Sequence, residues 1–126
     1  MATFASGIKG YAKRTGLSID KAVIAVCAKA STEIIRKTPV DTGRARGNWF
    51  ATIGNTSTDT SEVRTDGEAI GDAITTSMKA SGNIFYLTNN LPYIRRLEYG
   101  YSKQAINGMV RLTIAEIEQD LQRNFK

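Results

Sequence analysis

The longest regular pattern of apolar and polar positions lies in residues 18–37. Apolar residues recur there at intervals of three and four, which is the spacing of one face of an α-helix. Ser18 is a good N-cap, and Pro39 ends the segment because the residue before a proline avoids helical angles. The pattern therefore predicts a long helix with one face in the core. The apolar stripe consists of Ile19, Val23, Val26, Cys27, Ala30 and Ile34.

A second apolar stripe follows the same helix beside the first. Its members are Leu17, Ile24, Ala28 and Ile35. Together the two stripes widen the apolar arc to roughly 200°, more than one neighbouring element usually covers. Either the helix is held between a sheet and another helix, or the second stripe contacts another subunit. On the second interpretation, Ile24 and Ile35 are candidate interface residues.

The N-terminal segment is predicted to be a short amphipathic helical arm. Phe4, Ile8 and Tyr11 have helical spacing, and the pattern ends near Gly16. The opposite side of this helix is basic. We therefore divide the chain into an arm, residues 1–16, and one domain, residues 17–126.

Two short segments alternate between apolar and polar residues, as expected for strands with one buried face. They comprise residues 48–53 and residues 84–88, which we expect to pair in a small antiparallel sheet. Residues 62–65 are predicted to form a return strand after a turn-rich stretch. An amphipathic helix is predicted to start behind Asp66 and to end near Lys79.

The C-terminal third is predicted to hold a short helix and a longer one. The short helix lies within residues 89–100, where Asn89 or Asn90 can cap it and Arg95 can pair with Glu98. The first residues of the segment 110–125 fit either a strand or a helix. The four-residue spacing of the later apolar residues favours the helix. The predicted fold class is α+β, a small antiparallel sheet packed by about three helices with an N-terminal helical arm.

Composition and charge add a basic region and no sign of a membrane segment. The chain has 126 residues, with 17 Lys and Arg against 12 Asp and Glu. The positive excess lies in residues 1–50. It has two interpretations: a patch that attracts phosphates or an acidic partner, or a surface that only keeps the protein soluble. A single cysteine and the absence of a signal peptide or membrane span predict an intracellular protein without disulfides or a membrane partner.

The residue types of several common active sites are missing. There is no histidine, the commonest general base and metal ligand, and Cys27 lies on the apolar stripe of the long helix. The acidic residues between positions 59 and 72 do not have the spacing of a calcium loop. We therefore expect no enzyme activity, no metal and no cofactor. A hydrolase that uses Asp66 and Asp72 is the enzymatic alternative.

Basic side chains also flank a glycine-rich turn. Arg44 and Arg46 precede Trp49 and Phe50, a combination that can bind nucleic acid through phosphate contacts and stacking. The same residues also fit a turn with solvated charges before a core strand. A nucleic-acid-binding module that uses the basic N-terminal third is therefore one functional alternative.

Two segments resemble a known family. TPVDTGRARGNW at residues 38–49 and YLTNNLPYIRRLEYGYSKQAINGMVRLT at residues 86–113 are similar to the small tail-completion, or head-tail joining, proteins of long-tailed double-stranded DNA bacteriophages. Members of that family typically read TPVDTG before an arginine, then NNLPYA, EYG, SKQAP and GMVR. The resemblance covers about two-thirds of the chain. Ile94 and Ile106 depart from the pattern, which usually has a small residue and a proline at these positions.

The resemblance implies a structural virion protein that forms a ring around the DNA channel where the tail meets the head connector. It implies a homo-oligomer, with a hexamer as one candidate size, that contacts a tail-terminator or tail-tube protein and the connector. We expect it in the virion neck, and in the host cytoplasm during assembly. The candidate subunit interface consists of Tyr93, Arg95, Arg96, Glu98, Tyr99 and Tyr101.

A ring around DNA implies transient, non-specific contact with the genome. The candidate residues for a DNA-facing lumen are Arg44, Arg46, Lys9 and Lys13. For the candidate interface, an internal role is the other interpretation, in which Tyr93 and Leu97 cover the sheet while Arg95 and Glu98 pair within the chain.

Overall fold

Six helices and a two-stranded antiparallel sheet make up the part of the chain that the computed structural model describes, namely residues 4–40, 44–99 and 108–123. The fold class is α+β, as predicted from the sequence. Among these residues, no helix is long and apolar enough to cross a lipid bilayer.

The first two helices confirm the predicted arm and long helix. Helix α1 spans Phe4–Thr15 and α2 spans Ile19–Lys37. Gly16 has a φ of 75°, the left-handed conformation that ends many helices. Ser18 Oγ accepts a hydrogen bond from the backbone N–H of Lys21 at 3.2 Å, which makes it the N-cap of α2.

The sheet also follows the predicted alternation. Strand β1 covers Trp49–Ile53 and β2 covers Phe85–Asn89, with Ala51 opposite Leu87 in the antiparallel register. Opposite residues of such a pair point to the same face, so these two side chains lie on one face with Trp49. That face packs into the hydrophobic core.

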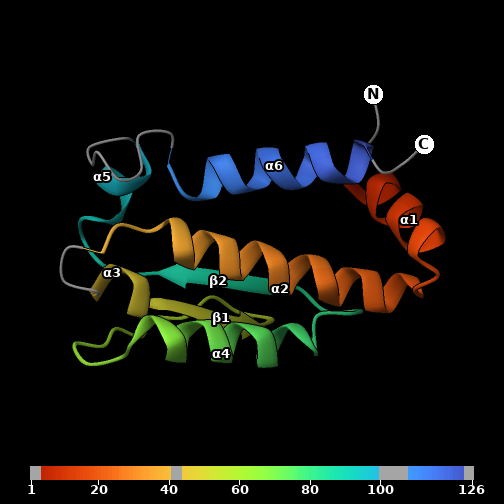
Figure 1. The fold of residues 1–126 in the computed structure, drawn as a ribbon. Helices are drawn as coiled ribbons and strands as arrows, with labels where there is room; N and C mark the ends of the chain where they lie inside the picture. The colour runs from red at the N-terminus through yellow and green to blue at the C-terminus, as the bar shows by residue number, and fades with distance from the viewer. Residues whose placement is uncertain (1–3, 41–43, 100–107, 124–126) are drawn as a thin grey trace.

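Helix α4 spans Asp66–Ser77 and lies beside α2 and against β1 (Figure 1). Its buried side chains are small, Ala69, Ala73 and Ser77, so α4 can approach its neighbours closely. The N-cap is Thr65, and the helix ends before Lys79. The helix thus ends near the predicted position, but Lys79 lies beyond its last turn.

Residues 62–65 do not form the predicted return strand, since the sheet of the described residues has two strands. The Ser61 hydroxyl instead accepts hydrogen bonds from the backbone N–H groups of Val63 at 3.2 Å and Arg64 at 3.0 Å. A side chain that binds the following backbone in this way offers an alternative to a sheet ladder.

The remaining helices are α3, Arg44–Gly47, α5, Ile94–Glu98, and α6, Val110–Arg123. Figure 1 shows α6 along the upper side of the molecule, from α5 at one end to α1 at the other, and it contacts both α1 and α2. The preference for a helix over a strand in the last segment is confirmed.

The main hydrophobic core lies where α2, α4, the sheet and the start of α6 meet. Its buried members are Ile34, Ile35, Trp49, Ala69, Ala73 and Met109. Ile35 is fully buried within the chain, so the second apolar stripe of α2 faces the core at that position. The suggestion that Ile35 contacts another subunit is therefore wrong for this fold. Ile24 is half-buried.

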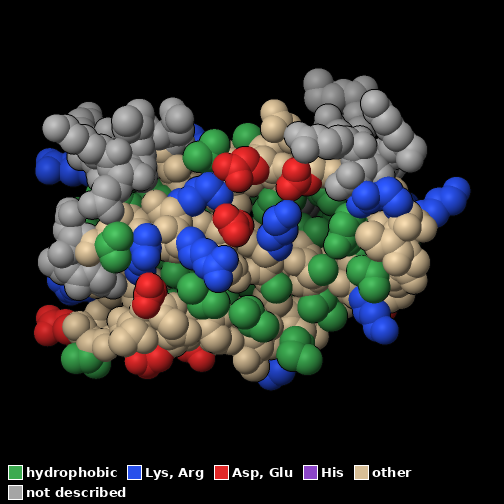
Figure 2. Space-filling view, viewed as in Figure 1, with side chains coloured by type: hydrophobic (Ala, Val, Ile, Leu, Met, Phe, Trp, Pro, Cys, Tyr) green, Lys and Arg blue, Asp and Glu red, His purple; other side chains and the backbone are tan. Residues whose placement is uncertain are grey.

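Charged side chains are distributed unevenly over the surface. In Figure 2, Lys and Arg side chains lie over α1 at the right and across the middle of the view, and acidic side chains lie along the lower left edge, over α4 and the loop before it, and near the top, over α6. This arrangement reproduces the sequence, where the basic excess is N-terminal and the acidic excess is central.

Candidate interaction surface on α5

Arg46, a predicted DNA-contacting residue, holds the polypeptide backbone in this structure. Its Nε donates to the Thr38 carbonyl at 2.6 Å, and its Nη2 donates to the Arg36 carbonyl at 2.7 Å. Its Nη1 lies 3.6 Å from Asp66 Oδ2. These carbonyls close the C-terminal end of α2, where helices leave acceptors unsatisfied. Arg46 therefore joins the end of α2 to the start of α4, and its guanidinium has little left to offer a phosphate.

Thr38 and Trp49 complete the same junction from the inside. The Thr38 hydroxyl donates to the Ile34 carbonyl at 2.7 Å and accepts a hydrogen bond from Trp49 Nε1 at 2.9 Å. Thr38 and Trp49 are buried, so each polar group needs this partner. Arg44, the other predicted DNA contact in this segment, is half-buried in α3.

Asn48 links the junction to the loop before α4. Its Nδ2 donates to the carbonyls of Arg44 and Ser61, both at 2.7 Å, and its Oδ1 accepts from the Ser61 N–H at 2.8 Å. A fully buried amide in which both ends are satisfied fixes the two segments relative to each other.

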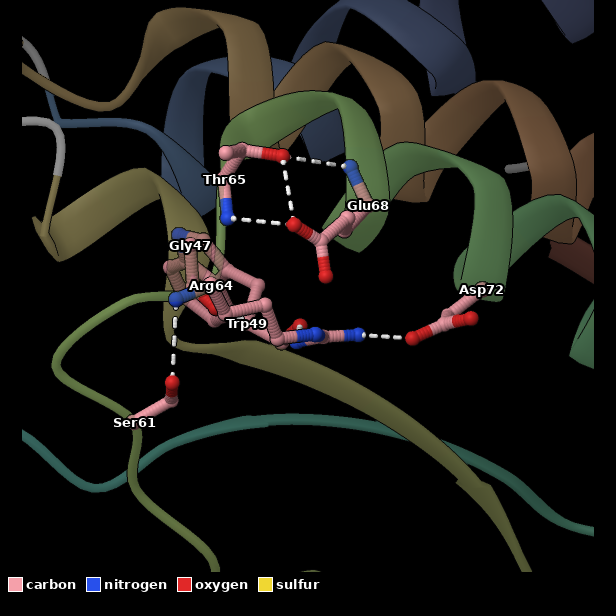
Figure 3. Close-up of polar contacts among 7 residues, drawn as sticks. All are labelled: Gly47, Trp49, Ser61, Arg64, Thr65, Glu68 and Asp72. Carbon is pink, nitrogen blue, oxygen red and sulfur yellow. Dashed lines mark hydrogen bonds and ion pairs between the residues drawn. The ribbon is translucent and has the colours of Figure 1, made fainter.

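Arg64 is a structural residue that sequence reasoning missed (Figure 3). Its guanidinium donates to the carbonyls of Gly47 at 3.1 Å and Trp49 at 2.6 Å, and it pairs with Asp72 at 2.6 Å. It also lies 4.1 Å from the ring centroid of Phe50. The available signal was weak: a single arginine within the acidic central block.

The backbone of Arg64 passes so close to Gly47 that only glycine fits. A Cβ at position 47 would lie 1.8 Å from the Arg64 carbonyl oxygen. Next along the chain, Thr65 and Glu68 form a capping box, in which each side chain binds the other's backbone N–H (Figure 3). The polar groups of these segments are thus engaged with one another within the chain.

Glu98 caps helix α6 from outside that helix. Its Oε1 accepts from the backbone N–H groups of Met109 at 2.9 Å and Val110 at 2.8 Å. Its Oε2 accepts from the backbone N–H and the Nε of Arg111, both at 3.0 Å. A carboxylate at this place satisfies donors that a helix start leaves free, and it also interacts favourably with the helix dipole.

The electrostatics of Glu98 follow from these contacts. Partial burial raises the pKa of this carboxyl, but hydrogen bonds from the N–H groups of Arg111, Val110 and Met109 and from the Arg111 side chain outweigh that effect. The pKa of Glu98 therefore lies below its ordinary value. Gly108 permits the geometry, because it has a φ of 81° and a Cβ there would lie 2.4 Å from the Glu98 carbonyl oxygen.

The expected pairing of Arg95 with Glu98 is wrong. The Glu98 carboxylate is engaged by Arg111 and by three backbone N–H groups, a set of donors that one neighbour on a short helix cannot match. Nor do the asparagines cap α5. Asn89 Nδ2 donates to the Ala45 carbonyl, and Asn90 Nδ2 donates to the Ser57 carbonyl.

The outward side of α5 remains open to solvent. Tyr93 is 36% exposed and Tyr99 is 59% exposed, and Arg95 and Arg96 are both exposed. We call these four residues the α5 surface. Arg111 lies 4.9 Å from the ring centroid of Tyr99. Tyr101 lies outside the described residues.

The inward side of α5 packs against the rest of the chain. Ile94 and Leu97 pack against the hydrophobic core. Leu97 thus has the internal position that the second interpretation gave it, whereas Tyr93 is 36% exposed. Apolar residues inside and aromatic and guanidinium groups outside give this short helix a fixed orientation.

Two other regions offer less specific chemistry. An apolar groove of about 280 Å³ lies between α2, the sheet and the start of α6, and includes Cys27 and Ser31 in its lining. The Ser31 hydroxyl donates to the Cys27 carbonyl, and burial raises the pKa of the Cys27 thiol.

Lys9 and Lys13 are exposed on α1. Within the described ranges, no three His, Cys, Asp or Glu side chains could together hold a metal ion.

Comparisons with known proteins identify no relative. No protein-family model matches the sequence, and neither the curated proteins nor the solved structures include a significant match. The family suggested by the two motifs therefore remains a prediction from those residues.

Proposed function

We propose that this protein is a structural component of a tailed bacteriophage virion that completes the tail or joins it to the head. In this role it assembles with identical copies into a ring around the DNA channel, between a tail-terminator or tail-tube protein and the head connector. It works by shape and surface chemistry, and we assign it no catalytic residue and no cofactor.

The observation that carries this proposal is the exposed α5 surface. Tyrosine and arginine are, with tryptophan, enriched in the energetically important centres of protein interfaces. Four of them occupy one short helix and its caps. Their backbone is fixed by Leu97 below and by Glu98 at the start of α6, so the surface is pre-organised for binding.

The distribution of arginines supports an interface over a DNA-binding module. Arg46, in the first motif, is committed to backbone carbonyls, while Arg95 and Arg96, in the second, are exposed. Lys9 and Lys13 remain as candidates for weak contact with DNA in the lumen. A moderate attraction suits a channel through which a genome must move, because phosphate contacts strengthen as their number grows.

The test is to locate the protein and to follow joining when the surface is removed. A phage that lacks the gene is complemented with a variant in which Tyr93, Arg96 and Tyr99 are all alanine. We expect the parent protein at the neck of intact particles, and we expect separate heads and tails with the variant, provided circular dichroism shows a folded protein. Full infectivity with the folded variant, or a label along the whole tube, would contradict the proposal.

DNA titration separates the alternative function. A nucleic-acid-binding module should bind duplex tightly at low salt and lose affinity steeply as salt rises. A ring subunit should bind isolated DNA weakly throughout. Tight, salt-sensitive binding that depends on Lys9 and Lys13 would favour the alternative.

A further inference from the structure

Strand β2 has a row of backbone hydrogen-bonding groups without a partner. The Gly54 N–H donates to the Ile84 carbonyl at 2.9 Å, and such pairs recur at every second residue of an antiparallel ladder. Tyr86 therefore bonds to β1, whereas the N–H and C=O groups of its neighbours Phe85 and Leu87 point away from that strand. Within the described part of the chain, no hydrogen bond reaches these groups of Phe85 and Leu87.

The other edge of the sheet is closed. Helix α4 lies beside β1 (Figure 1), and the outward carbonyl of Trp49 accepts a hydrogen bond from Arg64 at 2.6 Å. The edge of β2 is therefore the one at which this sheet can grow. A sheet of two strands depends strongly on its surroundings, because a pair of strands alone is marginally stable in water.

The apolar groove lies along the free edge of β2. Its lining includes the side chains of Phe85 and Leu87, and it has no charged member among the described residues. The opposite wall belongs to the first apolar stripe of α2, which was predicted to face the core. Of that stripe only Ile34 is buried, and Ile19 is 52% exposed. The half-buried members in the wall are Val26, Cys27 and Ala30.

The length of the groove matches one short strand. Its residues on α2 run from Val26 to Ile34. At 1.5 Å per residue this distance is about 12 Å, the length of about four residues of a β-strand. Since every second side chain of a strand points to the same face, such a strand directs two side chains toward α2.

We propose that the free edge of β2 binds an extended segment of a different protein, which adds a third strand to the sheet. The unpaired N–H and C=O groups select an extended backbone, and the uncharged groove selects apolar side chains at every second position. This inference concerns a surface separate from the α5 surface, and it does not rest on the proposed function.

A second copy of this chain fits this site poorly. Its β1 has the closed edge described above. Antiparallel pairing of its β2 would follow a two-fold axis and bring both α2 helices over the same two strands, because α2 lines the groove and Leu87 packs on the core to which α2 contributes. Adjacent strands are about 5 Å apart, whereas packed helices need about 8–10 Å. The observations therefore favour another protein as the source of the strand.

Amide hydrogen exchange measured by NMR tests both the edge and its occupant. In the protein alone, the N–H groups of Phe85 and Leu87 should exchange at least about 10-fold faster than that of Tyr86, which bonds to β1. The probe is the synthetic peptide acetyl-KTVTVTVTK-amide, a soluble strand with valine at alternate positions. Its addition should slow exchange at Phe85 and Leu87 at least about 10-fold and change Tyr86 little.

Two methylated peptides separate strand addition from apolar contact alone. One carries N-methyl groups on two valines, and the other carries them on the two threonines between the valines. In an added strand only one of these sets of N–H groups faces β2. The peptide methylated on that set should bind at least about 10-fold more weakly than the other in calorimetric titration, because it loses hydrogen bonds to the edge.

A matched pair of variants tests the groove. Ala30→Glu places a charge in its wall and should weaken binding of the unmodified peptide at least about 10-fold, because a charge against apolar side chains is costly. The control is Lys21→Glu, at an exposed position of the same helix outside the groove lining, which should bind like the parent. Circular dichroism checks the fold of both variants, and if Ala30→Glu unfolds, the methylated peptides decide on the parent protein.

Several results would overturn the inference. Slow exchange of Phe85 and Leu87 in the free monomer would show that the edge is already covered. Equal binding of the two methylated peptides, or normal binding by folded Ala30→Glu, would exclude strand addition in the groove. A dimer in sedimentation velocity of the protein alone, with Phe85 and Leu87 protected, would make a second copy the occupant. None of these results bears on localisation at the neck, so the proposed function stands or falls separately.

Discussion

Residues 44–49 and residues 93–99 have similar side chains but use them differently. Each segment combines arginines with aromatic residues beside a tight backbone approach. In the first, Arg46 donates hydrogen bonds to two carbonyls at the end of α2, and the Trp49 indole donates one to the Thr38 hydroxyl. In the second, Glu98 caps α6, and Arg95 and Arg96 are exposed to solvent. An arginine in a motif therefore indicates a binding site only when its donors are not already engaged.

The largest effect is expected at Gly47, in the inward-directed segment. Gly47→Ala places a Cβ 1.8 Å from the Arg64 carbonyl oxygen, so the backbone must move. We expect a loss of about 3 kcal/mol in the free energy of unfolding, at the upper end for an overpacked site. Urea denaturation measures it. The matched control is Gly71→Ala, which should leave stability unchanged or raise it by up to ~1 kcal/mol; equal losses in both variants would contradict the account.

Glu98 is the structural residue of the outward-directed segment, and Glu98→Gln tests its role. The amide keeps the shape but loses the charge that binds three N–H groups and Arg111. We expect a loss of about 2 kcal/mol, from charge-assisted hydrogen bonds and the helix dipole together. Arg95→Ala should change stability by no more than about 0.5 kcal/mol. If both variants unfold at the same urea concentration, the proposed division of tasks is wrong.

The pH dependence of stability gives a second measure of Glu98. Its pKa in the folded protein lies below its ordinary value, so the folded state favours the charged form. Its contribution is therefore full above the unfolded pKa of about 4.3 and is lost as pH falls through the folded pKa. The difference in unfolding free energy between the parent and Glu98→Gln should be constant near neutral pH and shrink in acid. A difference that grows in acid would have the wrong sign.

A smaller stability effect is expected for Arg46→Lys. An ammonium cannot reproduce the two directed hydrogen bonds to the Arg36 and Thr38 carbonyls, so we expect a loss of about 1 kcal/mol. Thermal unfolding followed by circular dichroism measures it. An unchanged melting temperature together with weaker DNA binding would indicate that Arg46 contacts DNA and is not a structural residue.

The smallest stability effect is expected for Arg96→Ala, which should stay within about 0.5 kcal/mol of the parent. The same variant should assemble less well if the α5 surface binds a neighbouring copy. Measured side by side with Arg46→Lys, it separates a structural arginine from a binding one. A loss of stability without a loss of assembly would reverse their assignments.

The elements that follow from local patterns were predictable. The Ser18 cap, the alternation of β1 and β2 and the four-residue spacing of α6 depend on neighbours in sequence, and the structure confirms them. The contacts of Arg64 were not predictable in this way, because they join positions 15 and 17 residues apart whose proximity depends on the finished fold.

The same limit applies to the candidate site. Exposure of the α5 surface was expected, since adjacent arginines cannot both be buried. The partner of Glu98 was not, because a neighbour within the short helix was visible in the sequence and Arg111, thirteen residues away, was not. Ile35 was misjudged for a related reason: the width of an apolar arc does not specify which part of it the rest of the chain covers.

The cap on α6 also links the two ends of the molecule through one helix. Glu98 follows Arg96 by two residues and binds the first turn of α6, and α6 reaches α1 at its far end (Figure 1). The position of α6 is therefore set by α5 at one end and by the arm at the other.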